Sequence, residues 1–219
     1  QAREKVRKDK LWTERCVPIL YRPFDLREIY YVPWIVDWPR METMPHMLAG
    51  QNVSLGTTRS VEIGSGYAHI FASRAMIQHH TVSIKEVNYQ FPLYLFPGVG
   101  KADASMFCTW PAGTGGRLPN LDREFVDTLE KATKLAFVSD GRGDLVENFG
   151  PEDVLAYIYA VFHWPEYRRR YEPMLKLDFP RVPPPSDGEH FLAFLQRGHE
   201  LLAHHLLDKE PIRNLKSED

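Results

Sequence analysis

The sequence has few of the features that mark a protein class directly. Its 219 residues include two cysteines, Cys16 and Cys108, which lie far apart and in no CxxC pair. Two cysteines cannot form a cysteine-rich zinc site unless histidines complete it, and we interpret both as buried thiols in a reducing compartment. No apolar run approaches the roughly 18 residues that a transmembrane helix needs, so we expect no membrane contact.

Catalytic signatures are lacking as well. There is no GxSxG motif, and neither cysteine lies in a nucleophile motif. His79 and His80 are adjacent, so they cannot both face one metal from a strand, and the histidines near the C-terminus lack the i, i+4 spacing of a helical metal site. We therefore expect no catalytic centre, no metal and no cofactor in this chain, which favours a binding or specificity module.

The charge is nearly balanced, with a formal net charge of −2. Residues 1–110 contain 13 Lys and Arg against 10 Asp and Glu, and residues 111–219 contain 14 against 19. The front half is thus mildly basic and the back half acidic. An excess of this size is weak support for nucleic-acid contact.

The chain begins with a charged segment, QAREKVRKDK. A signal peptide would need an apolar stretch there, so we predict a cytoplasmic protein and interpret the chain as a piece of a longer one. Residues 1–16 are predicted to be a charged lead-in, in part a helix.

Residues 17–110 have the pattern of strands. β-Branched, aromatic and alternating apolar residues predict strands, and the prolines near the first two confine them to short or edge strands. The predicted strands are 17–21, 28–32, 52–59, 67–73 and 88–96. Methionines at helical spacing predict a short helix within Pro39–Leu48.

Residues 111–219 have a helical pattern after a glycine-rich loop over 98–120. Apolar residues recur every three or four positions after Pro119 and Asn120, and further helices are predicted to begin at Pro151 and Pro165. Ser186 and Glu189 have the spacing of a capping box for the last helix. The segment after Asp208 is predicted to be a loose polar tail.

These patterns predict an α+β fold. A strand-rich front half, with a mixed or antiparallel sheet and a short helix, precedes a helical back half that packs on it. The predicted division is a lead-in over 1–16, a β-rich part over 17–110 and a helical part over 111–219.

Seven phrases occur in an order that resembles one family. The phrases are YRPFDLREIYY (Tyr21–Tyr31), PRMETMPHML (Pro39–Leu48), NVSLGTTRS (Asn52–Ser60), HIFASRAMI (His69–Ile77), YQFPLYLFP (Tyr89–Pro97), EDVLAYIYAVFHWPEYRRRYEPMLKLDFPRVPPP (Glu152–Pro185) and GEHFLAFLQRGHELLAHHLL (Gly188–Leu207). In this order they make the chain similar to the C-terminal region of type ISP restriction–modification enzymes and related large adenine-N6 DNA methyltransferases.

The resemblance implies a target recognition domain without its catalytic domain. In such enzymes the S-adenosylmethionine site and the catalytic Asn/Asp-Pro-Pro-Tyr/Phe motif lie upstream, and no Pro-Pro-Tyr or Pro-Pro-Phe occurs here. The chain would choose the double-stranded DNA sequence on which an upstream methyltransferase domain acts. The parent would be an adenine-N6 DNA methyltransferase, in some cases with restriction endonuclease activity.

Candidate DNA contacts lie in or beside the predicted strands of the front half. Arginine can donate two hydrogen bonds to guanine, and asparagine or glutamine can pair with adenine. Arg59 and Arg74 are the preferred candidates. The others are Thr57, Thr58, Ser73, Gln78, His79, His80, Lys85 and Asn88.

Two alternatives stay open. The chain could be a helical interaction or scaffold module of the same kind of multidomain enzyme, because the acidic back half and its aromatic helix suit protein packing. It could also be an independent enzyme, which would need a cofactor site that the sequence does not show.

Overall fold

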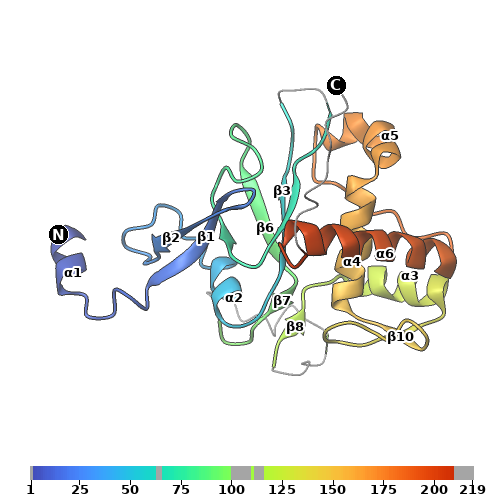
Figure 1. The fold of residues 1–219 in the computed structure, drawn as a ribbon, viewed down its shortest axis with the longest axis horizontal. Coiled ribbons are helices and arrows are strands. Elements are labelled where there is room, and N and C mark those ends of the chain that lie inside the picture. The colour runs from blue at the N-terminus through green and yellow to red at the C-terminus, as the bar shows by residue number, and fades with distance from the viewer. Residues whose placement is uncertain (1, 63–65, 100–109, 111–115, 210–219) are drawn as a thin grey trace.

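The computed structural model describes residues 2–62, 66–99, 110 and 116–209, and its strands lie beside a group of four helices (Figure 1). The chain starts with helix α1 (Ala2–Lys8), which buries none of its residues and stands at the far end from the helical group. The predicted charged lead-in is thus a short exposed helix followed by turns. Of the predicted polar tail, residues 210–219 lie outside the described residues.

The first sheet has the order β2-β1-β5. Strands β1 (Cys16–Arg22) and β2 (Asp25–Tyr30) form an antiparallel hairpin, and β5 (Met76–Ile77) pairs with β1 in parallel. The hairpin turn contains Phe24 at a φ of 65°, a left-handed conformation that is unusual for a bulky residue. Its ring contacts Phe71 of the second sheet edge-on at 5.1 Å, which fixes the turn against the body.

The second sheet is antiparallel, with the order β4-β3-β6. Its strands are β3 (Ser54–Thr58), β4 (Ile70–Ser73) and β6 (Asn88–Pro92). Every residue of β4 is buried, because Ile70 and Ala72 face the helical core while Phe71 packs with Leu20 of the first sheet. The predicted strand at 67–73 is therefore covered on both faces.

Two small sheets complete the strands of the described residues. The predicted strand 88–96 is divided into β6 and β7 (Tyr94–Leu95), and β7 pairs antiparallel with β8 (Leu118–Pro119). Strands β9 (Ala136–Phe137) and β10 (Asn148–Phe149) form a parallel pair. The predicted loop over 98–120 thus ends in a strand, and most of its remainder lies outside the described residues, as does Cys108.

The back half consists mainly of helices α3 (Arg123–Thr133), α4 (Pro151–His163), α5 (Pro165–Leu175) and α6 (Gly188–His205). Helix α4 is central and buries most of its side chains, because the sheet and the other helices surround it. At its crossing with α6 the backbones nearly touch. A Cβ atom on Gly198 would lie 1.8 Å from the carbonyl oxygen of Ala156, so this position requires glycine.

Two predicted helix starts are shifted. Helix α3 is capped by Asp122, whose carboxylate accepts from Phe125 N at 2.8 Å, so Pro119 and Asn120 lie before it. Helix α6 is capped by Asp187, which accepts from His190 N at 2.8 Å. The predicted box of Ser186 and Glu189 was wrong because the neighbouring aspartate, in extended conformation, supplies the cap.

The α+β prediction is confirmed, with strands mostly in the front half and helices in the back half. The short helix predicted within Pro39–Leu48 is present as α2 (Met44–Leu48). One large core joins the halves, since Ile70 and Tyr94 pack in the same cluster as Val126 and Phe191. No helix among the described residues is long and apolar enough to cross a bilayer.

Candidate nucleic-acid interface

The connection from β5 to β6, residues 78–87, is folded around one buried amide. Asn88 is 8% exposed, and its Oδ1 accepts from the backbone N–H groups of Val82 and Ser83, the latter at 3.3 Å. Its Nδ2 donates to the carbonyl of Glu86 at 2.8 Å. Asn88 thereby holds residues 82–86, while Gln78 accepts from His80 N and Thr81 donates to the carbonyls of Leu20 and Gln78, so the loop presents its other side chains in a defined arrangement.

That loop presents two histidines, a lysine and an apolar tip. Lys85 is exposed, and Ile84 beside it is 72% exposed. Gln78 Oε1 accepts from Arg22 Nη1 at 3.2 Å and from His80 N at 2.7 Å, so Gln78 connects the loop to the hairpin. We call residues 78–87 the recognition loop.

A cleft of about 460 Å³ lies between the recognition loop, the hairpin and the segment that precedes α2. Its rim includes Trp38, Arg40, His79 and His80. The rings of Trp38 and His79 lie edge-to-face at 6.3 Å. Burial, and then the nearby His80 and Arg40, hold the pKa of His79 below its ordinary value. His79 is thus neutral at pH 7 and offers one donor and one acceptor.

Arg59 follows the end of β3 and pairs with an acid from the back half. Its Nε donates to Asp178 Oδ1 at 3.1 Å, and both side chains are more than half exposed. A hydrogen bond from the backbone of Phe179, and then the Arg59 guanidinium, hold the pKa of Asp178 below its ordinary value.

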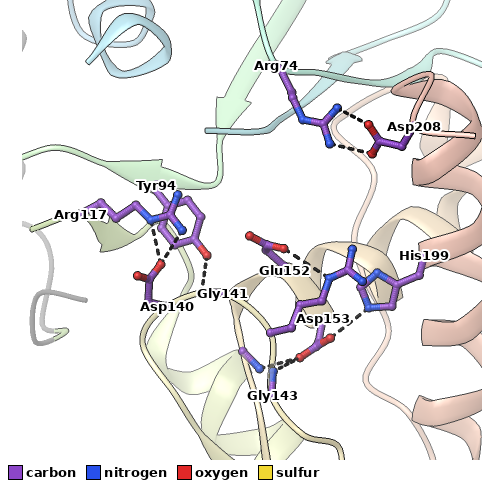
Figure 2. A network of polar contacts seen from close by, with 12 residues as sticks. Arg74, Tyr94, Arg117, Asp140, Gly141, Gly143, Glu152, Asp153, His199 and Asp208 are labelled. Atoms are coloured by element: carbon purple, nitrogen blue, oxygen red, sulfur yellow. Dashed lines mark hydrogen bonds and ion pairs between the residues drawn. The ribbon is translucent and has the colours of Figure 1, made fainter. Parts of the chain in front are cut away.

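Arg74 follows the end of β4 and is also paired. Its two terminal nitrogens donate to the carboxylate of Asp208, beyond α6, at 2.8 and 2.7 Å (Figure 2). The hydrogen bond raises the pKa of Arg74 and lowers that of Asp208. Exposed pairs of this kind contribute about 0–1 kcal/mol to stability, so either partner can be exchanged at low cost.

The three remaining candidates of the two strands are buried. Thr57, Thr58 and Ser73 are at most 5% exposed. Thr57 Oγ1 lies 2.5 Å from Tyr67 OH, and Ser73 Oγ donates to the carbonyl of Ala75 at 2.8 Å. Like Asn88, these residues have polar atoms inside the fold, so in this conformation they support the loops and do not face a partner.

The structure separates the candidates into two groups. His79, His80 and Lys85 lie on the recognition loop, which enters β6 at the end of the second sheet where β3 leads into Arg59. Arg74 lies at the opposite end, because β3 and β4 are antiparallel and Ser54 is opposite Ser73. At the usual rise along a strand, the two ends are about 20 Å apart.

Around Arg74, ion pairs line a cavity of about 550 Å³ between the second sheet and the helices (Figure 2). Arg117 binds Asp140 at 2.7 Å and lies over the ring of Tyr94 at 3.7 Å. Behind the lining residue His199, the buried Asp153 accepts from its ring at 3.0 Å and from the backbone N–H groups of two glycines. Each arginine that lines this cavity is paired with a carboxylate, and the pair of Arg74 and Asp208 connects the two halves of the chain.

Sequence reasoning did not select Arg22, Trp38 or Arg40. The signal for the last two was the pair of tryptophans, Trp34 and Trp38, in a short segment bracketed by prolines, which is typical of a loop. Among residues 2–62, 66–99, 110 and 116–209, no three or more His, Cys, Asp or Glu side chains are grouped to hold a metal ion.

Comparison with known proteins links the chain to one family. A family model described as the Type ISP C-terminal specificity domain matches residues 1–218. A comparison with curated protein sequences found no match.

Solved structures with the same fold include three DNA complexes. The cryo-EM structure of the DrdV–DNA complex is 22% identical with a TM-score of 0.65, and the match covers 99% of this chain and 19% of that one. The ATP-dependent Type ISP restriction–modification enzyme LlaBIII bound to DNA is 19% identical with a TM-score of 0.64, covering 91% and 11%. A nuclease-deletion mutant of the Type ISP enzyme LlaGI, in complex with a DNA substrate mimic, is 18% identical with a TM-score of 0.59, covering 91% and 12%. The chain therefore spans less than a fifth of each of these matched chains.

Proposed function

Because the chain belongs to the Type ISP C-terminal specificity domain family, we propose that it selects the double-stranded DNA sequence on which its parent enzyme acts. The observation that carries this proposal is the family match over residues 1–218. The DNA-bound proteins that share the fold support it, as does a preorganised loop that presents hydrogen-bonding side chains at one end of a sheet.

Within this proposal, the recognition loop reads bases. Gln78, His79 and His80 carry side-chain groups that can hydrogen-bond to base edges. Gln78 is held by its bonds from Arg22 and His80 N, and Asn88 orders the following residues of the loop. Base-edge hydrogen bonds supply sequence choice, with about 1–3 kcal/mol of discrimination for a good bidentate pair. Thr57, Thr58 and Ser73 position the strands from which the loops extend.

Lys85, Arg59 and Arg74 supply charge. Arg59 and Arg74 are about 20 Å apart along the strand direction, which is less than one helical turn of DNA, so one duplex can span both. Each arginine would exchange its exposed carboxylate partner for a phosphate or for a guanine edge.

Selection from a random duplex pool tests this function. The 219-residue chain should enrich one short motif, and binding of that motif should weaken steeply with salt. Replacing Gln78 or His80 by Ala should relax the motif at particular positions, whereas Lys85→Ala should weaken all sequences alike. Enrichment of no motif by a chain whose circular dichroism shows it to be folded would refute the proposal.

The activity of the parent follows as part of the same proposal. We infer an upstream adenine-N6 methyltransferase domain that uses S-adenosylmethionine, in some parents joined to a nuclease. A methyltransferase must rotate its target base out of the duplex, so a separate domain that holds the DNA in register suits that chemistry. Transfer of a labelled methyl group by the full-length parent, at the motif that this chain enriches, tests the inference.

A second role is supported by an exposed apolar region at the end of α5. Met174 and Leu177 are 67% and 79% exposed beside a cleft of about 460 Å³. Surfaces of this kind mark protein contacts, so we propose that the helical half docks on another domain of the parent. Replacing both residues by Asp in the parent should release the domain to limited proteolysis while motif selection by the isolated chain stays unchanged.

A further inference from the structure

The cleft beside the recognition loop has an apolar floor and an aromatic, polar rim. Its volume of about 460 Å³ lies within the range of small-molecule sites. Asp37 is the acid among its lining residues, and Arg40 is the permanently charged cation. The floor is formed by Ile19, Ile29, Met44, Met76 and Ile77.

Trp38 on this rim is exposed to an unusual degree. Its side chain is 68% exposed, although an indole is among the most favourable groups to bury. Trp38 and Arg40 both have left-handed backbone conformations, with φ angles of 55° and 47°. Such conformations cost about 1–3 kcal/mol each and persist where the surroundings enforce them, often at ligand sites. Here the hydroxyl of Tyr31 donates to the carbonyl of Pro39, between the two strained residues.

The groups around the indole suit a planar, hydrogen-bonding ring. The guanidinium of Arg40 lies over one face of the Trp38 ring, 5.3 Å from its centre, and the His79 ring meets Trp38 edge-on. Indole faces stack on bases of every kind, and the nearby cation adds attraction for the adjoining phosphate. His79 and His80 also line the cleft; His80 Nδ1 donates to the carbonyl of Glu86 at 3.2 Å, which leaves its Nε2 for a ligand.

We propose that this cleft binds a nucleobase that has left the base stack, with its face against the indole of Trp38. The inference rests on the proposed function, because the occupant is an unpaired base of the DNA that the chain binds. The recognition loop forms one wall of the cleft, so a base displaced from the duplex beside that loop has a short path into it. Enzymes that act on bases accept the cost of unstacking and recover it by stacking the extruded base on aromatic side chains.

The test compares two duplexes that carry the motif enriched by the chain. One is fully paired, and the other has a single bulged 2-aminopurine beside the motif. The chain should bind the bulged duplex roughly 5- to 100-fold more tightly, with quenching of 2-aminopurine fluorescence by the indole. Trp38→Ala should reduce the ratio of bulged-duplex to paired-duplex affinity to about one, whereas Trp38→Phe should retain most of the preference.

Trp164→Ala is the matched control, since Trp164 is 45% exposed and its ring meets Phe194 edge-to-face in the helical half. Equal affinity for the two duplexes refutes the inference and leaves the proposed function standing, as expected if a protein segment occupies the cleft. A bulge preference that survives in Trp38→Ala also refutes it. If the free 2-aminopurine deoxyribonucleotide binds as tightly as the bulged duplex, the cleft is a mononucleotide site, and the assignment to DNA is wrong. Failure of the folded chain to enrich any motif overturns the proposed function and, with it, this inference.

Discussion

Neutralising Asp208 should strengthen DNA binding if Arg74 contacts a phosphate. In the free chain the carboxylate of Asp208 holds both terminal nitrogens of Arg74 at 2.8 and 2.7 Å. Asp208→Asn keeps the size and planarity of the side chain and removes its negative charge. Arg74 is then left with an unbalanced positive charge beside the bound duplex.

The magnitude follows from exposure and counterion release. The side chains of Arg74 and Asp208 are 53% and 46% exposed, so losing the ion pair should cost at most about 1 kcal/mol and lower the melting temperature by no more than about 4 °C. One additional effective phosphate contact steepens the slope of log affinity against log salt by about 0.9. Between roughly 50 and 200 mM salt, that slope changes the affinity ratio by a factor of about 3.5.

The assay is a salt titration of binding to the enriched duplex by fluorescence anisotropy. Asp208→Asn should have a steeper slope than the wild type, and Arg74→Ala a shallower one. Asp127→Asn is the matched control, because Arg123 and Asp127 on α3 form an ion pair of 2.8 Å whose side chains are 52% and 40% exposed. That change raises the net charge of the chain by the same amount as Asp208→Asn, but at a site outside the proposed interface.

Two results would refute the reasoning. Unchanged slopes in both Asp208→Asn and Arg74→Ala would mean that Arg74 joins the second sheet to the end of α6 and does not contact DNA. An equal rise in slope for Asp127→Asn would show that the effect comes from the total charge of the chain, wherever the charge lies.

Three further predictions concern residues that stabilise the fold. Asn88→Ala should lower the free energy of unfolding by about 1–3 kcal/mol and weaken DNA binding, because half-buried N–H groups of the recognition loop lose their acceptor and the amide of Asn88 is buried. Urea titration checks this, with Lys85→Ala as a variant of unchanged stability. Gly198→Ala should destabilise the chain by about 1–3 kcal/mol despite the better helix propensity of alanine, whereas Gly188→Ala, whose Cβ would meet Thr133 at 3.5 Å, should not. Burial lowers the pKa of His163 from 6.5 to about 4, so between these pH values the unfolded chain binds a proton that the folded chain excludes. The urea midpoint of unfolding should therefore fall as the pH drops from about 6.5 to 4. The fall should be smaller in His163→Leu.

The helical half was largely predictable because its signals are local. Prolines at positions 151 and 165 begin helices α4 and α5, as predicted, since proline at the first turn loses no intrahelical hydrogen bond. The predicted caps near Asn120 and Ser186 were wrong by one or two residues. Several adjacent polar residues could serve as a cap, and packing decided which one is in extended conformation.

The candidate site was predictable in region but not in residues. The residues around 57–59 and 73–88 are polar and lie beside strands, which selected Arg59, Arg74 and the residues of the recognition loop together with Thr57, Thr58 and Ser73. Nothing local distinguishes a threonine that faces solvent from one covered by a second layer. In the structure the first sheet and the helices cover β4 from both sides, which places Ser73 inside, and the neighbouring strand β3 is likewise buried at Thr57 and Thr58.

The sequence by itself determined the family, the order of strands before helices and the helix starts at prolines, because these depend on residues close together in the chain. The tertiary structure alone decided which polar residues are accessible and which charges are already paired. Arg59 meets Asp178, 119 residues later, and Arg74 meets Asp208, 134 residues later. Trp38 and His79 likewise form one rim because the first sheet brings β1 and β5 together. Such contacts join segments that are distant in sequence, so local sequence patterns do not predict them.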